Sequence, residues 1–79
     1  MDVEIYSKTN CGFCNKAKIK LQKYSPKIHM LNTDYTREEF YTKFPNAKTF
    51  PQIIIDKKHI GGYRELKNWL EKNSFEEEF

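Results

Sequence analysis

Two cysteines three residues apart are the side chains of this sequence best suited to chemistry. Cys11 and Cys14 are its whole cysteine content, and they lie where a short apolar strand pattern at residues 3–6 gives way to a helical one. Thiols at positions i and i+3 of a helix start can close into a disulfide. The first of them lies against unshared backbone N–H groups and the positive end of the helix dipole. The arrangement predicts a redox site.

The same spacing also begins many zinc sites, so a metal centre is the first alternative. A closed structural zinc site needs four ligands, and beyond the cysteines only His29 and His59 are available. Their separation in sequence is far from the short spacing of a zinc finger. We therefore expect no metal at the cysteine pair.

Length and composition limit the kind of protein that surrounds this pair. The 79 residues are enough for one small domain, over residues 1–79, with a core built from 6 Phe, 5 Tyr and 1 Trp. No run has the length of a membrane helix, and residues 1–4 carry acid where a secretory signal carries base. We expect a cytoplasmic protein, in which reducing conditions favour a catalytic cysteine pair over a structural disulfide.

The net charge of +3 is unevenly distributed. Six lysines and no acidic residue occur between Glu4 and Asp34, so the lysines surround the cysteine pair in sequence. Such a face attracts anions, or it only keeps a helix surface solvated. Because aromatic residues do not alternate with these lysines, and residues 76–78 are acidic, nucleic acid is not an expected partner.

Periodicity predicts the elements that position the cysteines. We expect strands at residues 3–6, 28–31, 53–55 and 59–60, helices at 12–24, 36–44 and 63–72, and a frayed acidic tail at 74–79. The order β-α-β-α-β-β-α predicts an α/β fold with three helices on one mixed four-stranded sheet. With the first and third strands antiparallel, the loop before Ile53 meets the loop that carries Cys11.

The helices also carry local signals. Residues 36–39 match a capping box, which starts the second helix. Apolar residues at helical spacing predict the buried faces, and Ile19 falls outside them. The expected buried faces are Phe13, Ala17, Leu21 and Tyr24 with Cys14 at the margin, then Phe40, Tyr41 and Phe44, then Leu66, Trp69 and Leu70.

The chain resembles a glutaredoxin over nearly its whole length. Lys8 lies three residues before the motif Cys11-Gly12-Phe13-Cys14, and Thr49-Phe50-Pro51, Gly61-Gly62 and a closing helix follow in that family's order. The resemblance implies a thioredoxin-like fold with the cysteine motif at the start of the first helix. It also implies a cis bond before Pro51, which leaves the backbone of the preceding residue free to pair with an extended peptide.

The resemblance implies a mechanism as well. Cys11 is the expected nucleophile, because the helix N-terminus and Lys8 can lower its thiol pKa from about 8.5 to roughly 3.5–7.5. It attacks a substrate disulfide, and Cys14 then resolves the mixed disulfide. Glutathione restores the dithiol. The expected partners of this monomeric enzyme are glutathione and disulfide-containing proteins, with ribonucleotide reductase as one candidate.

By the same resemblance, glutathione lies between the cysteine motif and the last helix. Cations face its glycine carboxylate, backbone N–H groups at the helix start hold its γ-glutamyl carboxylate, and an acid meets its ammonium group. The residues expected to contact it are Lys8, Phe13, Lys48, Thr49, Phe50, Pro51, Gly62, Tyr63, Arg64 and Glu65.

The sequence departs from the family pattern at two places. Arg64 stands where many members carry Ser, Thr or Asp, and Glu65 stands where they carry Asp. Glu65 can meet the ammonium group, or it can be an ordinary first-turn acid that favours the helix dipole. Gly12-Phe13 replaces the Pro-Tyr that is common in dithiol members and matches the monothiol class.

Two other functions therefore stay open. One is a small redoxin reduced by thioredoxin reductase, although no Trp precedes Cys11 as in thioredoxin itself. The other is binding of an iron–sulfur cluster, with Cys11 and a glutathione thiol from each of two chains as ligands. Against the second, the loop after Lys8 lacks the extra segment of monothiol members, and Cys14 offers a competing disulfide.

Overall fold

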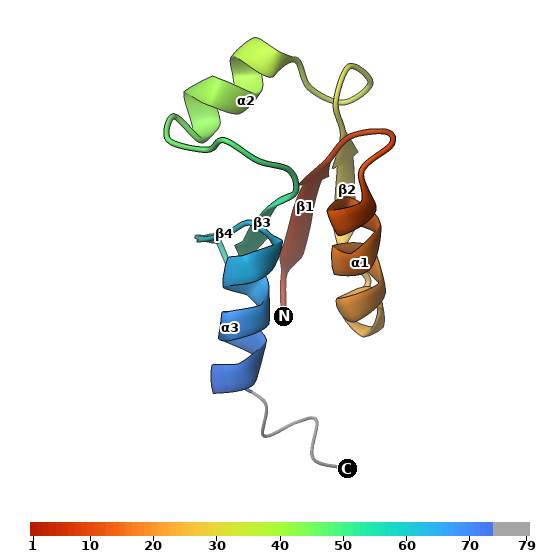
Figure 1. Cartoon of the computed structure of the whole chain (residues 1–79), viewed down its shortest axis with the longest axis vertical. Coiled ribbons are helices and arrows are strands. Elements are labelled where there is room, and N and C mark those ends of the chain that lie inside the picture. Colours follow the sequence, from red (N-terminus) through yellow and green to blue (C-terminus); the bar gives the residue numbers. More distant parts are fainter. Residues whose placement is uncertain (74–79) are drawn as a thin grey trace.

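The computed structural model describes residues 1–73, so the predicted tail at 74–79 lies outside the described residues. The order of helices and strands is the predicted β-α-β-α-β-β-α, and the α/β class is confirmed (Figure 1). None of the helices formed by residues 1–73 has the length and apolar content needed to cross a lipid bilayer. The elements are β1 (Val3–Ser7), α1 (Gly12–Lys20), the 3₁₀ turn η1 (Gln22–Tyr24), β2 (Lys27–Met30), α2 (Arg37–Lys43), β3 (Gln52–Ile55), β4 (Lys58–Gly61) and α3 (Tyr63–Lys72).

The four strands form one mixed sheet in the order β2-β1-β3-β4. β1 runs parallel to β2 and antiparallel to β3, and β3 runs antiparallel to β4. Because Tyr6 near the end of β1 pairs with Gln52 at the start of β3, the loops that follow and precede these residues lie at one end of the sheet. This is the predicted meeting of the two loops, and α2 lies beyond the same end (Figure 1).

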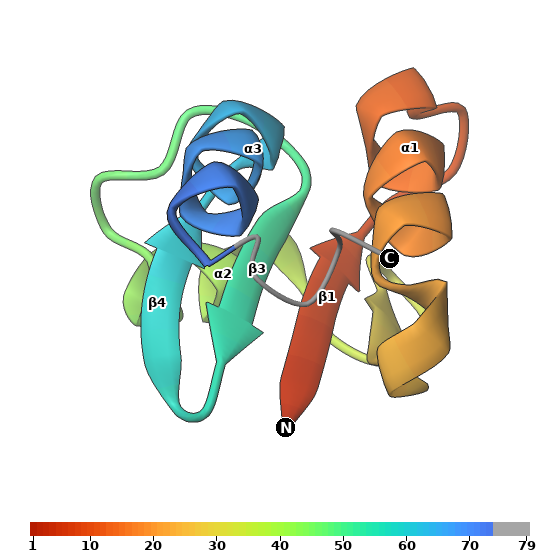
Figure 2. The same cartoon turned by 90° about the horizontal axis from the view of Figure 1, so that it is seen from below.

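The two faces of the sheet carry separate apolar clusters, as the two-residue period of a strand requires. Ile53 and Ile55 of β3 belong to the larger cluster, together with Ala17 of α1 and Leu66 of α3. Figure 2 shows α1 and α3 on this face of the sheet. Ile54 points to the other face and joins the smaller cluster, which includes Tyr35, Phe40 and Phe44.

The first helix is shorter than predicted. α1 ends at Lys20, and residues 22–24 continue as a 3₁₀ turn. This turn is closed by a hydrogen bond of 2.9 Å from Tyr24 N to Leu21 O. The tighter turn suits a chain that must leave the helical region before Pro26. Leu21 and Ala17 are fully buried and Ile19 is exposed, as predicted.

Two aromatic residues differ from the predicted buried faces. Phe13 is 56% exposed, because it lies in the first turn of α1, where its ring stacks on Tyr63 at 5.5 Å rather than entering the core. Tyr41 is 45% exposed, whereas Phe40 and Phe44 are buried. Residues four apart share a face of a helix, and the short α2 buries only that face.

The other local predictions on α2 and α3 hold. Thr36 Oγ1 accepts from Glu39 N at 3.1 Å, and Glu39 Oε1 accepts from Thr36 N at 2.8 Å, which is the predicted capping box. α3 has the predicted bounds, with Leu66 and Leu70 buried and Trp69 partly buried. Both helices are therefore fixed at their starts by their own side chains.

Candidate active site

The two cysteines form a disulfide at the start of α1, with their Cα atoms 5.2 Å apart. Cys11 is the N-cap of the helix, in extended backbone conformation, and its Sγ accepts from Cys14 N at 3.2 Å. Cys11 is 9% exposed and Cys14 is fully buried. Of the two sulfur-bearing residues, only Cys11 reaches the surface.

The dipole of α1 favours negative charge on the Cys11 sulfur. α1 has no acidic residue in its first turn and carries Lys18 and Lys20 in its last turn, so neither end opposes the helix dipole. The backbone N–H of Cys14, in the first turn, points at the Cys11 sulfur. Negative charge on that sulfur is therefore stabilised by the helix start.

A loop with a cis peptide bond borders the Cys11 sulfur. The bond between Phe50 and Pro51 is cis, as the family resemblance implies, and Pro51 is buried. The carbonyl oxygen of Phe50 lies 3.8 Å from Cys11 Sγ. A chain bound through its sulfur to Cys11 would thus lie beside the backbone of this loop.

Two glycines let the start of α3 approach the same loop. Gly61 has φ +123°, and a Cβ atom there would lie 2.8 Å from Glu65 Cγ. At Gly62, a Cβ atom would lie 3.3 Å from Thr49 Oγ1 and 3.4 Å from the Pro51 carbonyl oxygen. The structure therefore has an unusual backbone angle at Gly61 and a close approach at Gly62.

A cavity of about 300 Å³ opens between these parts. Seven of the ten residues expected to contact glutathione line it, namely Phe13, Thr49, Phe50, Gly62, Tyr63, Arg64 and Glu65.

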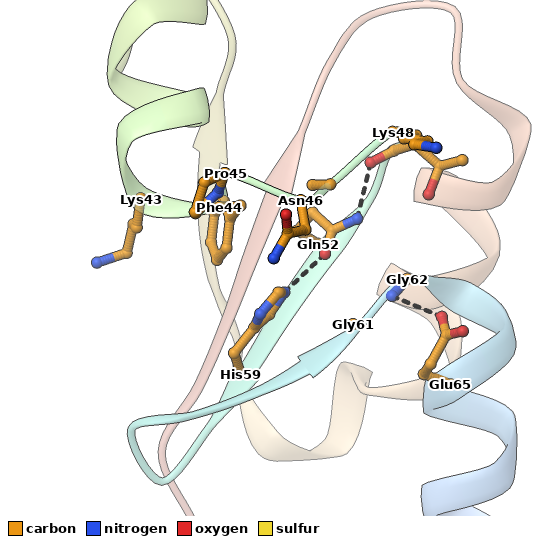
Figure 3. A pocket seen from close by; sticks show the side chains of 12 residues that line it. Lys43, Phe44, Pro45, Asn46, Lys48, Gln52, His59, Gly61, Gly62 and Glu65 are labelled. Atoms are coloured by element: carbon orange, nitrogen blue, oxygen red, sulfur yellow. Dashed lines mark hydrogen bonds between the residues drawn. The ribbon is translucent and has the colours of Figure 1, made fainter.

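The other three expected contact residues do not line this cavity. Lys8 Nζ is 5.4 Å from the centre of the Phe50 ring, and Pro51 forms the cis bond below it. Lys48 instead lines a second cavity of about 340 Å³, which shares Thr49, Gly62 and Glu65 with the first (Figure 3). The structure thus brings Lys8 to the cis-proline loop, whereas Lys48 lines the second cavity and not the first.

Glu65 does part of what each interpretation of the sequence expected. Its Oε1 accepts from Gly62 N at 2.9 Å, which caps the start of α3 (Figure 3). Its side chain also lines both cavities. The carboxylate therefore stabilises the helix start and stays within reach of a ligand there.

Sequence reasoning missed Arg37. It lies in the first turn of α2, and its guanidinium carbon is 6.0 Å from the centre of the Phe50 ring. Phe40 stacks on that ring at 4.4 Å, which fixes the position of the ring. The capping-box motif contained Arg37, but nothing local in the sequence indicates that α2 begins beside the cis-proline loop.

Tyr35 holds the strand that leads into the cysteine loop. Its hydroxyl donates to the Ser7 carbonyl oxygen at 2.6 Å, and burial raises the pKa of Tyr35 to about 12. Burial also raises the pKa of Tyr6, with the charge of Glu4 as a second cause. Both phenols thus stay protonated at neutral pH, and Tyr35 acts as a donor.

Both histidines are engaged away from the cysteines. His29 Nε2 lies 3.0 Å from Glu4 Oε1, and His59 Nε2 lies 2.7 Å from Gln52 Oε1. Within residues 1–73, no three His, Cys, Asp or Glu side chains are grouped as metal ligands would be.

Comparisons with known proteins bear on this site. The model of the glutaredoxin family matches residues 3–60. Glutaredoxin 1 of Rickettsia prowazekii (strain Madrid E) is 40% identical, over 86% of this chain and 75% of that protein. Glutaredoxin 3 of Escherichia coli (strain K12) is 37% identical, over 82% of this chain and 81% of that protein.

A solved structure extends the likeness to the fold. Reduced Escherichia coli glutaredoxin is 28% identical, with a TM-score of 0.78 over 94% of this chain and 98% of that chain. Glutaredoxin 1 of Francisella tularensis is 29% identical, with a TM-score of 0.76 over 92% of this chain and 95% of that chain. The predicted thioredoxin-like architecture is thereby confirmed.

Proposed function

We propose, from the premise that this chain belongs to the glutaredoxin family of thiol–disulfide oxidoreductases, that glutathione supplies its electrons. Its substrates are protein disulfides and mixed disulfides of glutathione. The observation that carries the proposal is the place of Cys11: it is a helix N-cap, and its sulfur lies 3.8 Å from the carbonyl oxygen of Phe50, a residue that lines the cavity. The partner thiol Cys14 is buried one turn inside the helix.

The reaction follows from these positions. The Cys11 thiolate attacks one sulfur of the substrate disulfide, forms a mixed disulfide, and releases the other sulfur as a thiolate. Cys14 loses its proton and attacks the Cys11 sulfur. The Cys11–Cys14 disulfide forms, and the second substrate thiolate leaves and takes up a proton. Two glutathione molecules then return the pair to the dithiol and become glutathione disulfide.

The cavity beside Cys11 suits glutathione in charge and shape. Lys8 and Arg37, both near the Phe50 ring, supply cations for the glycine carboxylate. The N–H groups of Tyr63 and Arg64, at the start of α3, can hold the γ-glutamyl carboxylate. Glu65 lines the cavity near that helix start and can meet the ammonium group. Phe13, more than half exposed, packs beside the peptide.

The proposal includes the setting of the enzyme. We expect it to work as a monomer in the cytoplasm, where a reduced glutathione pool regenerates the dithiol. Ribonucleotide reductase is one candidate protein substrate.

One pair of variants tests the roles of the cysteines. Turnover is measured with the mixed disulfide of glutathione and 2-mercaptoethanol, coupled to glutathione reductase, and separately with a protein disulfide. Cys11→Ser should abolish both activities, because it removes the attacking sulfur. Cys14→Ser should retain the first activity and lose the second, which needs a resolving thiol. Equal loss in both variants would contradict the assigned roles.

The same assay separates the competing reductant. Oxidised wild-type protein is incubated either with glutathione, glutathione reductase and NADPH, or with thioredoxin reductase and NADPH. Reduction by glutathione alone supports the proposal. Reduction only by thioredoxin reductase would reject it and make the chain a differently coupled redoxin.

A further inference from the structure

Gln52 is a buried polar side chain next to the cis-proline loop. It is the first residue of β3 and is 4% exposed. Its Nε2 donates to the Thr49 carbonyl oxygen at 2.9 Å, and its Oε1 accepts at 2.7 Å from His59 (Figure 3). Both ends of the amide are thus paired, as burial requires.

The two bonds fix each other's direction. A carbonyl oxygen can only accept, so the nitrogen end of the amide must face Thr49 and the oxygen end must face His59. His59 Nε2 must therefore carry a proton. His59 in turn is held by Phe44, because the two rings lie 4.6 Å apart. A chain of contacts leads from the end of α2 to the base of the cis-proline loop.

Backbone hydrogen bonds do little to hold the Thr49 end of this loop. Of the backbone hydrogen bonds that residues 1–73 make outside the helices and the sheet, none involves Thr49, Phe50 or Pro51. Thr49 is exposed and lines both cavities, whereas Phe50 stacks on Phe40 and Pro51 is buried, so packing holds Thr49 less than the two residues after it. The bond from Gln52 therefore fixes a carbonyl that packing leaves loose.

We propose that Gln52, oriented by His59, is a positioning residue for substrate binding. It holds the Thr49 carbonyl and thereby sets where the Phe50 backbone lies beside the Cys11 sulfur, without touching the substrate. The inference deepens the proposed function and rests on it. Because Gln52 acts on the binding edge and not on the sulfur, its loss should raise KM and leave the chemical step unchanged.

The test is steady-state kinetics of Gln52→Met, which keeps the size of the side chain and removes both hydrogen bonds. We expect KM for the glutathione mixed disulfide to rise about 3- to 10-fold, the range set by one lost hydrogen bond. The value of kcat should stay within about twofold, because the attacking sulfur is unchanged. The Cys11 thiol pKa, followed by thiolate absorbance, should match that of wild type.

A second variant changes the exposed His59, so that the test does not depend on a substitution in the core. His59→Phe keeps the ring on Phe44 and removes the donor to Gln52, so we expect a smaller rise in KM, about 2- to 3-fold, since the amide becomes free to turn. The double variant should equal Gln52→Met alone, because His59 acts only through Gln52.

His29→Phe is the matched control. His29 also pairs through Nε2, with Glu4 at 3.0 Å, and stacks on an aromatic ring, Tyr6 at 4.4 Å, but it lies on β2. Its KM should equal that of wild type. An unchanged KM in folded Gln52→Met, a rise in His29→Phe, or additive effects of the Gln52 and His59 changes would overturn the inference.

The outcome stays separate from that of the proposed function. Failure of the wild-type protein to turn over glutathione mixed disulfides would reject the proposed reductant and leave the loop untested by that substrate. The same variants are therefore assayed with a peptide disulfide, which pairs with the Phe50 backbone without glutathione. A KM rise there supports the positioning role, and its absence rejects it.

Discussion

The two ends of the sheet are closed in different ways. At the end far from the cysteines, two hydrogen bonds join the residue before β1 to the residue after β3. Asp56 N donates to Asp2 O at 2.7 Å, and Asp2 N donates to Asp56 Oδ1 at 2.8 Å. The turn there holds Asp56 and Lys57 at positive φ. At this end the backbone N–H groups of Asp2 and Asp56 are both paired within the protein.

At the end that carries Cys11, none of the turn and loop backbone hydrogen bonds within residues 1–73 involves Thr49, Phe50 or Pro51. Three side chains hold its loops: the Tyr35 hydroxyl donates to Ser7 O, the Gln52 amide donates to Thr49 O, and the Glu65 carboxylate accepts from Gly62 N. Side-chain anchors fix a loop without using up its edge, so the Phe50 backbone stays available to a ligand. The difference predicts that changes at the two ends separate stability from activity.

The largest effect should come from Gly61→Ala at the active end. Its φ of +123° disfavours any side chain, and the new Cβ would lie 2.8 Å from Glu65 Cγ. We expect a loss of about 3 kcal/mol in the free energy of unfolding, from strain and overlap together. Activity should fall with it, since Glu65 caps the helix start that faces the loop.

Urea unfolding and glutathione-dependent turnover measure both effects. A fully stable Gly61→Ala protein would show that α3 can shift away from the loop at no cost. The close approach at Gly62 would then not be a fixed part of the site.

Tyr35 gives the next largest effect, and it depends on pH. Its folded pKa of about 12 lies above the ordinary value of 10.0, so its stabilising contribution is complete below pH 10 and is lost as pH rises toward 12. The loss should reach about 2 kcal/mol. Tyr35→Phe should be less stable by about 1 kcal/mol at pH 7, for want of the bond to Ser7, and should lack this alkaline loss.

Unfolding in urea at several pH values from 7 to 12 measures the contrast. A wild-type protein whose stability above pH 10 falls no more steeply than that of Tyr35→Phe would show that another group carries the alkaline transition.

The sequence-based predictions succeeded where the signal is local. The capping box at residues 36–39, the bounds of α3 and the cysteines at the start of α1 each follow from residues within one turn of each other. The antiparallel β1–β3 pair, which brings the two loops together, follows from topology rules.

What the sequence did not reveal depends on where the elements meet. Arg37 faces Phe50 only because α2 lies beyond the end of β1, and the exposed Phe13 finds Tyr63 because α1 and α3 cover one face. The bond between His59 and Gln52 joins β3 and β4 beside an irregularity in their register, and no periodicity predicts that pairing. Contacts between residues that are far apart in the sequence produce no local sequence pattern from which they could be predicted.

At the far end, Asp56→Ala should cost stability without affecting activity. It removes the bond to Asp2 N and places alanine at a φ of +50°, so we expect a loss of about 1 kcal/mol in the free energy of unfolding. The value of kcat/KM should stay at the wild-type level. A fall in kcat/KM measured well below the unfolding transition would show that the two ends of the sheet are coupled.

The smallest effect should come from Gly12→Ala, the same substitution as at Gly61 in a setting where nothing lies within 4 Å of the new Cβ. Gly12 is the first residue of α1, and alanine there lowers the entropy of the unfolded chain, so we expect a gain of about 0.5 kcal/mol in stability. Urea unfolding of the oxidised and the reduced protein measures it. A loss would mean that the backbone between the cysteines needs the freedom of glycine, and that the cysteine loop, unlike the far turn, is tuned by its conformation rather than by its contacts.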